Sequence, residues 1–243
     1  MAGNARAAAE IAAAAGELLL AIRGRLARGL DADEVRAEAD LRAHELILSL
    51  LRERFPADDV LSEEAPEDRR RPGAPRRWIV DPLDGTREFG EEGRADWAVH
   101  VALVEDGRLA AGAVALPALD AIYTSEPAPP APSGVKRPPR IVVSRTRPAA
   151  DARDLAERLG GELVPMGSAG AKAMAVVSGE ADVYFHTGGQ YVWDSAAPVA
   201  VAAAAGLHTS RVDGSPLSYD SSSTWLPDLL ICRPELAPDV LRG

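Results

Sequence analysis

The pattern of apolar and polar positions predicts two helices at the start of the chain. Between residues 4 and 26 apolar side chains recur at helical spacing, and Glu10 and Glu17 interrupt the apolar run. The segment therefore predicts an amphipathic helix rather than a signal peptide or a membrane span. Residues 31–55 show a second apolar face at the same spacing. Pro56 ends this helix, because proline disfavours helix at the preceding residue and cannot continue the ladder.

Short apolar runs predict strands along the rest of the chain. Val60–Leu61 and Trp78–Val80 are single strands, and residues 97–125 have the spacing of an antiparallel meander. The proline-rich residues 127–139 predict a linker. Beyond the linker, strands at 140–144, 162–165, 181–185 and 228–232 alternate with helices at 148–159, 169–178 and 194–205.

This alternation favours an α/β arrangement for the second half, after a first half that mixes helices with an antiparallel sheet. We therefore expect two domains. Residues 1–135 would form an N-terminal α+β domain, and residues 136–243 a C-terminal α/β domain. The chain has 243 residues, of which 47% are hydrophobic, and this is enough for the two domains to share a core.

Composition narrows the class of function. A net charge of −10 and a pI near 5.0 argue against a surface that binds nucleic acid. They do not exclude phosphorylated substrates, because bound metal ions can reverse the local sign of the charge. Cys232 is the only cysteine, so no disulfide can form within the chain and a reducing compartment is favoured. We expect a cytoplasmic protein that binds neither nucleic acid nor a membrane.

Acidic residues stand where predicted strands end or helices begin. Asp81 and Asp84 follow one strand, Glu63 follows another, and Asp194 opens a helix. Taken singly, these groups also have plain structural interpretations as a surface turn, a solvated loop and a helix N-cap. Taken together, they supply the oxygen ligands that a hard divalent cation such as Mg²⁺ prefers. The sequence therefore favours a metal site.

The stretch that follows Asp81 suggests how this site would handle phosphate. Pro82 fixes the backbone, so that the Leu83 carbonyl can turn inward toward an ion. Gly85 and Thr86 then offer backbone N–H groups at the start of a predicted helix. The first N–H groups of a helix have no partner within it, and they favour a bound phosphate.

Three motifs carry a resemblance that covers nearly the whole chain. "SEE", "WIVDPLDGT" and "WDSAAP", in this order and at these separations, resemble the Mg²⁺-dependent, lithium-sensitive phosphatases of the inositol monophosphatase superfamily. "DPLDGTREF", "DWAVHVAL" and "GSAGAKAMAV" are most similar to the CysQ-type 3′-phosphoadenosine 5′-phosphate (PAP) phosphatases of the actinobacterial branch. The resemblance implies a layered sandwich of alternating α-β-α-β-α layers, as in inositol monophosphatase and fructose-bisphosphatase. It also implies a homodimer.

The resemblance assigns roles to the candidate residues. It implies that two to three Mg²⁺ ions activate a water molecule for direct attack on a phosphate monoester. Asp40, on the second predicted helix, would orient this water together with Thr86. The loop before Asp40 is shorter than the family pattern, which leaves open whether a third ion binds. The implied metal ligands are Glu63 (also catalytic), Asp81, the Leu83 carbonyl, Asp84 and Asp194, and Gly85 and Thr86 would bind the phosphate.

The substrate class depends on the second half of the chain. Inositol-specific members carry a glutamate at the position of Thr187. The absence of this glutamate argues against an inositol phosphate as the substrate. PAP-type members carry a lysine at the position of Lys172, which would bind a second phosphate; a surface lysine on a helix is the alternative. The resemblance places further substrate contacts at Ser144, Arg145, Gly167, Ser168, Gly170 and, on the adenine side, Tyr219.

We therefore expect hydrolysis of PAP to AMP and phosphate, which removes a by-product of sulfate assimilation. Two alternatives stay open: a broader phosphatase for inositol 1-phosphate or fructose 1,6-bisphosphate, and an inactive relative that binds metabolites. A Ser-His-Asp hydrolase is disfavoured, because no nucleophile motif accompanies the histidines. Core or surface roles are expected for His44, His100, His186 and His208.

Overall fold

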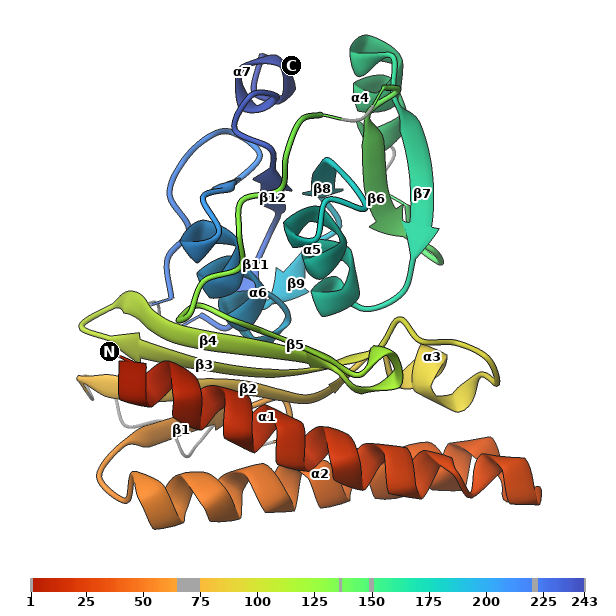
Figure 1. Cartoon of the computed structure of the whole chain (residues 1–243), viewed down its shortest axis with the longest axis vertical. Helices are drawn as coiled ribbons and strands as arrows, with labels where there is room; N and C mark the ends of the chain where they lie inside the picture. The colour runs from red at the N-terminus through yellow and green to blue at the C-terminus, as the bar shows by residue number, and fades with distance from the viewer. Residues whose placement is uncertain (1, 65–74, 136, 149–150, 220–222, 243) are drawn as a thin grey trace.

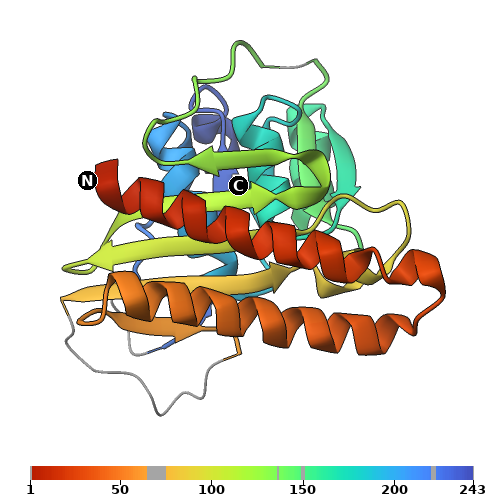
Figure 2. The ribbon, with the colours of Figure 1, turned by 60° about the horizontal axis from the view of Figure 1, so that its bottom comes forward.

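Two long helices lie side by side against one face of the first sheet (Figure 1, Figure 2). The computed structural model describes residues 2–64, 75–135, 137–148, 151–219 and 223–242. The helices are α1 (Ala2–Arg23) and α2 (Ala32–Arg54), and a short 3-10 helix, η1 (Leu26–Arg28), lies between them. The Asp31 carboxylate caps α2 by accepting the backbone N–H groups of Asp33 and Glu34. Both predicted helices are confirmed.

The first sheet has five strands in the order β1-β2-β3-β4-β5. β1 runs parallel to β2, and the other neighbours are antiparallel, which confirms the predicted meander. A short helix, α3 (Thr86–Gly90), follows β2, and a 3-10 helix, η3 (Pro117–Leu119), precedes β5. The strands are β1 (Asp59–Ser62), β2 (Arg76–Asp84), β3 (Ala98–Glu105), β4 (Arg108–Leu116) and β5 (Ala121–Thr124).

The second sheet also has five strands, in the order β10-β12-β8-β6-β7. β6 is parallel to β7 and β8, whereas β12 is antiparallel to β8 and β10, so the sheet is mixed. Its strands are β6 (Arg140–Ser144), β7 (Glu162–Met166), β8 (Val183–His186), β10 (His208–Ser210) and β12 (Leu229–Cys232). The helices in this half are α4 (Asp151–Leu159), α5 (Ala169–Val177), α6 (Val192–Ala204) and α7 (Ala237–Val240).

Among the described residues, three hydrophobic clusters hold five layers together (Figure 1). The first cluster packs α1 and α2 on the first sheet, and the second packs α5 and α6 between the two sheets. The third packs α4 and α7 on the outer face of the second sheet. The alanine-rich α6 approaches β4 closely, because a side chain at Gly112 would lie 2.6 Å from Ala200 Cβ. The predicted α-β-α-β-α sandwich is confirmed.

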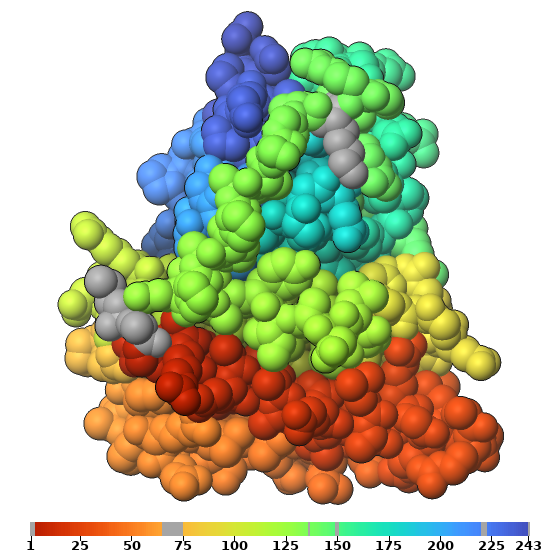
Figure 3. Space-filling model, viewed as in Figure 1, coloured from red at the N-terminus to blue at the C-terminus, as the bar shows by residue number. Residues whose placement is uncertain are grey.

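Some short elements escape the sequence pattern. They are β10, α7 and a two-stranded sheet of β9 (Gln190–Tyr191) and β11 (Trp225–Leu226), all too short to show a periodicity. Residues 126–135 form neither helix nor strand and run along the outside of the second half (Figure 3). The division into two domains stays a prediction, and Lys136, where the second domain would begin, lies outside the described residues. None of the described helices is long and apolar enough to cross a membrane.

Candidate active site

Strand β2 ends in two buried aspartates. Asp81 and Asp84 are 1% and 8% exposed, and the pairing of β2 with β3 shifts register between them. In a regular strand, residues three positions apart point to opposite faces. The irregularity, which contains Pro82, removes this alternation and lets both carboxylates converge. The stretch for which a surface turn is the alternative interpretation is therefore part of the strand.

A third carboxylate comes from helix α6. Asp194 lies in the first turn and accepts the backbone N–H of Tyr191 at 2.6 Å, which caps the helix. Its carboxylate also reaches the end of β2, where oxygen atoms of Asp81, Asp84 and Asp194 lie within 4.8 Å of one another. Among the residues that the structure describes, this is the one group of at least three acidic, histidine or cysteine side chains with such spacing.

The three carboxylates repel one another. Burial, followed by the charges of Glu63 and Asp84, raises the pKa of Asp81 well above its ordinary value. Burial and the charge of Asp84 raise the pKa of Asp194 to about 6. Buried carboxylates are unfavourable unless a cation receives them. This oxygen-only set of donors therefore fits a hard divalent cation such as Mg²⁺.

Asp84 is the member of the cluster that stays charged. Burial works to raise its pKa, but the imidazole of His100, the hydroxyl of Ser168 and the charge of Lys172 lower the pKa overall. Asp84 Oδ2 accepts the Ser168 hydroxyl at 2.5 Å and the Gly170 backbone N–H at 2.7 Å. These contacts join the end of β2 to the start of α5, so they fix the position of one carboxylate oxygen.

His100 supports Asp84 from β3. The side chain is fully buried, with Nε2 3.2 Å from Asp84 Oδ2 and Nδ1 3.1 Å from the backbone carbonyl of Trp193. Burial works to lower the pKa of His100, but the contacts with Asp84 raise it overall. Gly170 leaves room for the ring, because a Cβ there would lie 2.2 Å from Nε2. His100 is thus in the core, one of the two placements expected for the histidines, but the sequence does not reveal the contact with Asp84.

Thr86, Asp40 and Glu63 complete this end of the site. Thr86 Oγ1 donates to the Leu83 carbonyl at 3.1 Å and lies 3.5 Å from Asp40 Oδ1. Burial, followed by the charge of Glu64, raises the pKa of Asp40 to about 7. Glu63 is exposed as a residue, but partial burial of its carboxyl group and the charge of Asp194 raise its pKa to about 7. The structure thus brings all the predicted metal and water-orienting residues together.

A cavity of about 730 Å³ opens beside these residues. Its acidic wall is formed by Glu63, Asp84 and Asp194, and Thr86 lies beside them. The lining also carries basic residues, which makes the cavity suited to a ligand with more than one anionic group. They include Arg87, Arg145, Arg147 and Lys172, together with the predicted contacts Ser144, Gly167 and Ser168.

Lys172 is buried rather than a surface lysine. The residue is 5% exposed, and Nζ donates to the carbonyls of Gly167 at 2.8 Å and Ser168 at 2.7 Å. Burial lowers the pKa of Lys172 to about 8. Arg145 is also held, because its guanidinium pairs with Glu88 at 2.6 Å and Glu91 at 2.9 Å. Both cations therefore face the cavity from fixed positions.

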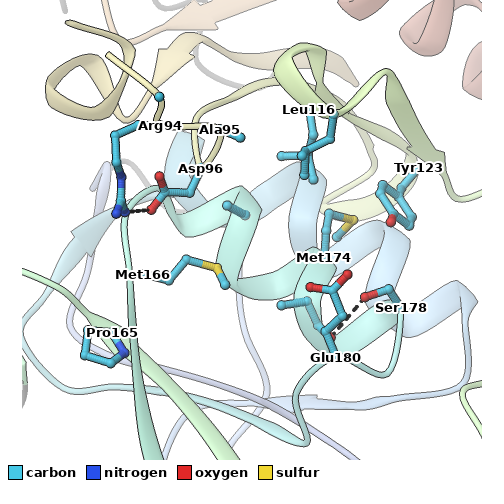
Figure 4. Close-up of a pocket in the computed structure, with 14 residues that line it drawn as sticks. Arg94, Ala95, Asp96, Leu116, Tyr123, Pro165, Met166, Met174, Ser178 and Glu180 are labelled. Atoms are coloured by element: carbon cyan, nitrogen blue, oxygen red, sulfur yellow. Dashed lines mark hydrogen bonds and ion pairs between the residues drawn. The ribbon is translucent and has the colours of Figure 1, made fainter. Parts of the chain in front are cut away.

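A second, smaller cavity of about 310 Å³ lies against another face of α5 (Figure 4). Met166 and Met174 line its apolar middle, and Arg94 forms an ion pair with Asp96 at one side. Asp96 also accepts the backbone N–H of Gly167 at 2.6 Å. Asp96 is thus paired with an arginine, whereas Asp81 and Asp194 have no ion-pair partner among the described residues.

Comparison with known proteins identifies the family. The model of the inositol monophosphatase family matches residues 4–239. The chain belongs to the inositol monophosphatase family. It is 50% identical over 251 residues to the 3′-phosphoadenosine 5′-phosphate phosphatase of Mycobacterium leprae, covering 98% of this chain and 92% of the relative. It is 35% identical over 199 residues to the 3′(2′),5′-bisphosphate nucleotidase CysQ of Escherichia coli, covering 77% and 80%.

Solved structures of proteins from this family have the same fold as this chain. CysQ from Bacteroides thetaiotaomicron superposes with a TM-score of 0.80 at 28% identity, covering 96% of this chain and 98% of that chain. Inositol monophosphatase II from Staphylococcus aureus superposes with a TM-score of 0.79 at 20% identity, covering 96% and 90%, which supports the fold alone. The predicted enzyme class is confirmed: the protein is a phosphatase of the inositol monophosphatase family.

Some predicted substrate contacts of this family member lie away from the cavity. Tyr219 is buried, and its hydroxyl lies 3.3 Å from Ser195 Oγ. Thr187 and Gly170 are not among the lining residues, although residues on either side of Thr187 are. Two lining residues that the sequence analysis does not single out are Tyr191 and Trp225. Tyr191 lies two residues before the "WD" of the third motif, and this position could have marked it in the sequence as a residue near the site.

Proposed function

We propose that this family member is a Mg²⁺-dependent phosphatase that hydrolyses PAP to AMP and inorganic phosphate. The observation that carries the proposal is a cavity lined both by Asp84 and Asp194, two of the three convergent carboxylates, and by basic side chains. PAP has a phosphate on each side of its ribose, so one phosphate would meet the carboxylate cluster through cations and the other the basic residues. The names of the curated relatives support the same substrate.

Five groups would hold two to three Mg²⁺ ions: the carboxylates of Glu63, Asp81, Asp84 and Asp194 and the carbonyl of Leu83. When bound, the ions lower the pKa of water and neutralise the negative charge of the phosphate and the leaving oxygen. The acidic cluster supports this arrangement because its carboxylates are unmatched by protein cations, apart from His100 and Lys172 near Asp84. Lithium would inhibit by competing for one of these positions.

Asp40 and Thr86 would orient the attacking water. Thr86 Oγ1 is held by the Leu83 carbonyl at 3.1 Å and lies 3.5 Å from Asp40 Oδ1, so the two side chains face one small region. The raised pKa of Asp40, about 7, is close to neutral pH, where a carboxylate can take up a proton from water. The backbone N–H groups of Gly85 and Thr86, at the start of α3, would bind the phosphoryl oxygens.

Lys172 and Arg145 would bind the second phosphate, and Ser144, Gly167 and Ser168 would line the path between the two phosphates. Lys172 Nζ makes two hydrogen bonds to carbonyls, which leaves one of its three N–H groups for a ligand. Gly170, Thr187 and Tyr219 stay predictions as substrate contacts, since none of them lines the cavity. Cytoplasmic location, homodimer formation and a part in sulfate assimilation likewise stay predictions.

A substrate panel tests the proposal. The kcat/KM values for PAP, inositol 1-phosphate and fructose 1,6-bisphosphate are measured with saturating Mg²⁺ and again after chelation. We expect PAP to rank first and activity to disappear with the metal. If PAP ranked last, a broader sugar phosphatase would replace this assignment. Absence of turnover on all three esters would leave the inactive, metabolite-binding relative.

A further inference from the structure

Two aromatic rings stand half-exposed at the wall of the active-site cavity. Tyr191 is 44% exposed and Trp225 is 50% exposed, and both line the cavity of about 730 Å³. The other three tryptophans, Trp78, Trp97 and Trp193, are buried. Exposed aromatic rings gathered at a cavity mark a surface that binds something, because burying them from water is favourable.

The two rings are held in fixed positions. The two-stranded sheet pairs Tyr191 with Trp225. Tyr191 stacks on Trp193 with 4.6 Å between ring centroids and meets Trp225 nearly at right angles, at 5.4 Å and 83°. The Trp225 ring packs on Gly189, where a Cβ would come within 1.9 Å of the ring. We call Tyr191 and Trp225 the aromatic corner; it is preorganised before any ligand binds.

An unpartnered polar group lies beside the aromatic corner. Gln190 is 7% exposed and lines the same cavity, and within the described part of the chain its buried Nε2 has no hydrogen-bond partner. Leaving a buried donor unsatisfied costs about 1–3 kcal/mol, so a ligand that accepts from it gains affinity. A carboxamide offers a donor and an acceptor side by side, which matches the adjacent acceptor and amino groups of a purine.

The corner is also close to the catalytic end of the cavity. The backbone N–H of Tyr191 donates to the Asp194 carboxylate at 2.6 Å, so one helical turn joins the ring to a metal-binding residue. A phosphate at the carboxylate cluster would therefore leave the rest of a nucleotide near these rings. Stacking on aromatic side chains is the usual way in which proteins hold unpaired bases.

We propose that the aromatic corner and Gln190 form the subsite for the purine base of the substrate. The inference rests on the proposed function and deepens it, since it names the groups that select a nucleotide over a sugar phosphate. It also replaces Tyr219, which is buried against Ser195, as the residue on the adenine side. Trp225 and Tyr191 contribute stacking, and Gln190 contributes the hydrogen bonds.

Equilibrium binding tests the subsite without turnover. With Mg²⁺ present, AMP and ribose 5-phosphate are titrated by calorimetry, and tryptophan fluorescence is followed in parallel. We expect AMP to bind more tightly and to quench the fluorescence of the exposed Trp225, whereas ribose 5-phosphate leaves the fluorescence unchanged. Trp225→Ala should weaken AMP binding about 5- to 150-fold, the range that stacking of one base supports, and Trp225→Phe should restore most of it. Equal affinity of AMP for the wild type and Trp225→Ala would overturn the inference.

Kinetics give the second measurement. The ratio of kcat/KM for PAP to that for glycerol 2-phosphate, which has no base, should fall about tenfold or more in Trp225→Ala and by less in Gln190→Ala. Ile122→Ala, at an exposed apolar position on β5, is the control and should keep the ratio. Equal losses on both substrates would mean that the aromatic corner only supports the structure. A changed oligomeric state with an unchanged ratio would mean that it forms an interface. If the wild type prefers inositol 1-phosphate, the proposed function fails, while AMP binding still decides the subsite.

Discussion

The two cavities that flank α5 differ in how their charges are matched. In the active-site cavity and directly beside it, Asp81, Asp84 and Asp194 converge within 4.8 Å, and burial, followed by repulsion from neighbouring carboxylates, raises the pKa of Asp81 and Asp194. In the second cavity, Asp96 is paired with Arg94 and accepts the N–H of Gly167. Both cavities contain carboxylates, so the number of acidic groups does not distinguish them. What distinguishes them is that Asp81 and Asp194 have no ion-pair partner among the described residues, whereas Asp96 has one.

Helix α5 serves both cavities with different faces. Its N-cap, Ser168, and its buried Lys172 face the carboxylates and the active-site cavity, whereas Met174 and Ser178 line the smaller cavity. The two sides are joined at Gly167, whose N–H is bound by Asp96 and whose carbonyl is bound by Lys172. Substitutions on the two sides should therefore separate chemistry from support of the fold.

The largest expected effect is loss of activity in Asp84→Asn. The change removes one negative charge from the carboxylate cluster while preserving shape, so kcat/KM should fall at least about 100-fold, with far-ultraviolet circular dichroism unchanged. Asp96→Asn is the matched control on the other side of α5. It loses an ion pair away from the cluster and should lose less than about tenfold. Comparable losses in the two variants would mean that the unmatched charge does not mark the catalytic site.

Lys172→Ala should separate substrates rather than abolish turnover. Loss of a charge-assisted hydrogen bond of about 1.5–3 kcal/mol should reduce kcat/KM for PAP about 10- to 150-fold more than for glycerol 2-phosphate. Ser178→Ala, which faces the smaller cavity, should leave this ratio within about twofold. The ratio is measured by steady-state kinetics on both esters. A ratio that stays at the wild-type value in Lys172→Ala would refute the role of the lysine at a second phosphate.

Metal should stabilise the fold through the same carboxylates. Saturation at 100 times Kd contributes about 2.7 kcal/mol, which for a chain of this size raises Tm by roughly 5–10 °C. Differential scanning calorimetry with Mg²⁺ and with a chelator measures the shift. Asp96→Asn should keep the shift and Asp84→Asn should lose most of it. A full shift in Asp84→Asn would place the stabilising ion elsewhere.

The smallest expected effect is a pH dependence of the chelated protein. Burial and the charge of Asp84 raise the pKa of Asp194 from 3.8 to about 6, so between these values the folded state binds more protons than the unfolded state. Stability therefore falls as pH rises from about 4 to about 6, by on the order of 1–3 kcal/mol. Tm of the metal-free protein should decline over this window, and Mg²⁺ should flatten the decline. Equal slopes with and without Mg²⁺ would contradict the assignment.

Local patterns predict much of the fold and of the candidate site. The strand before Asp81 and the helix around Asp194 follow from apolar runs and turn residues close in sequence, and the motifs between them mark the acidic groups. His100 is different, because its contact with Asp84 depends on the register of β2 with β3 and on Gly170, far along the chain. Periodicity gives the strand but not its neighbour's register.

The substrate side shows the same limit. Tyr191 and Trp225 meet only because a short strand returns to pair with β9, and two-residue strands leave no periodic signal. Tyr219 belongs to a segment that resembles the adenine side of relatives, yet the structure buries it. A resemblance transfers motifs more safely than it transfers single contacts, because the contacts depend on packing that a motif does not contain.

The origin of the acidic cluster has a mechanical consequence. Asp81 and Asp84 end a strand of the first sheet, and Asp194 begins a helix that packs between the sheets, far away along the chain. An ion held by all three would act as a reversible cross-link. Unlike a disulfide, which restricts the unfolded chain, the ion would stabilise only the folded state, because unfolding separates the three carboxylates. A chain with a single cysteine cannot form such a covalent bond within itself, so its rigidity would follow the supply of free cation.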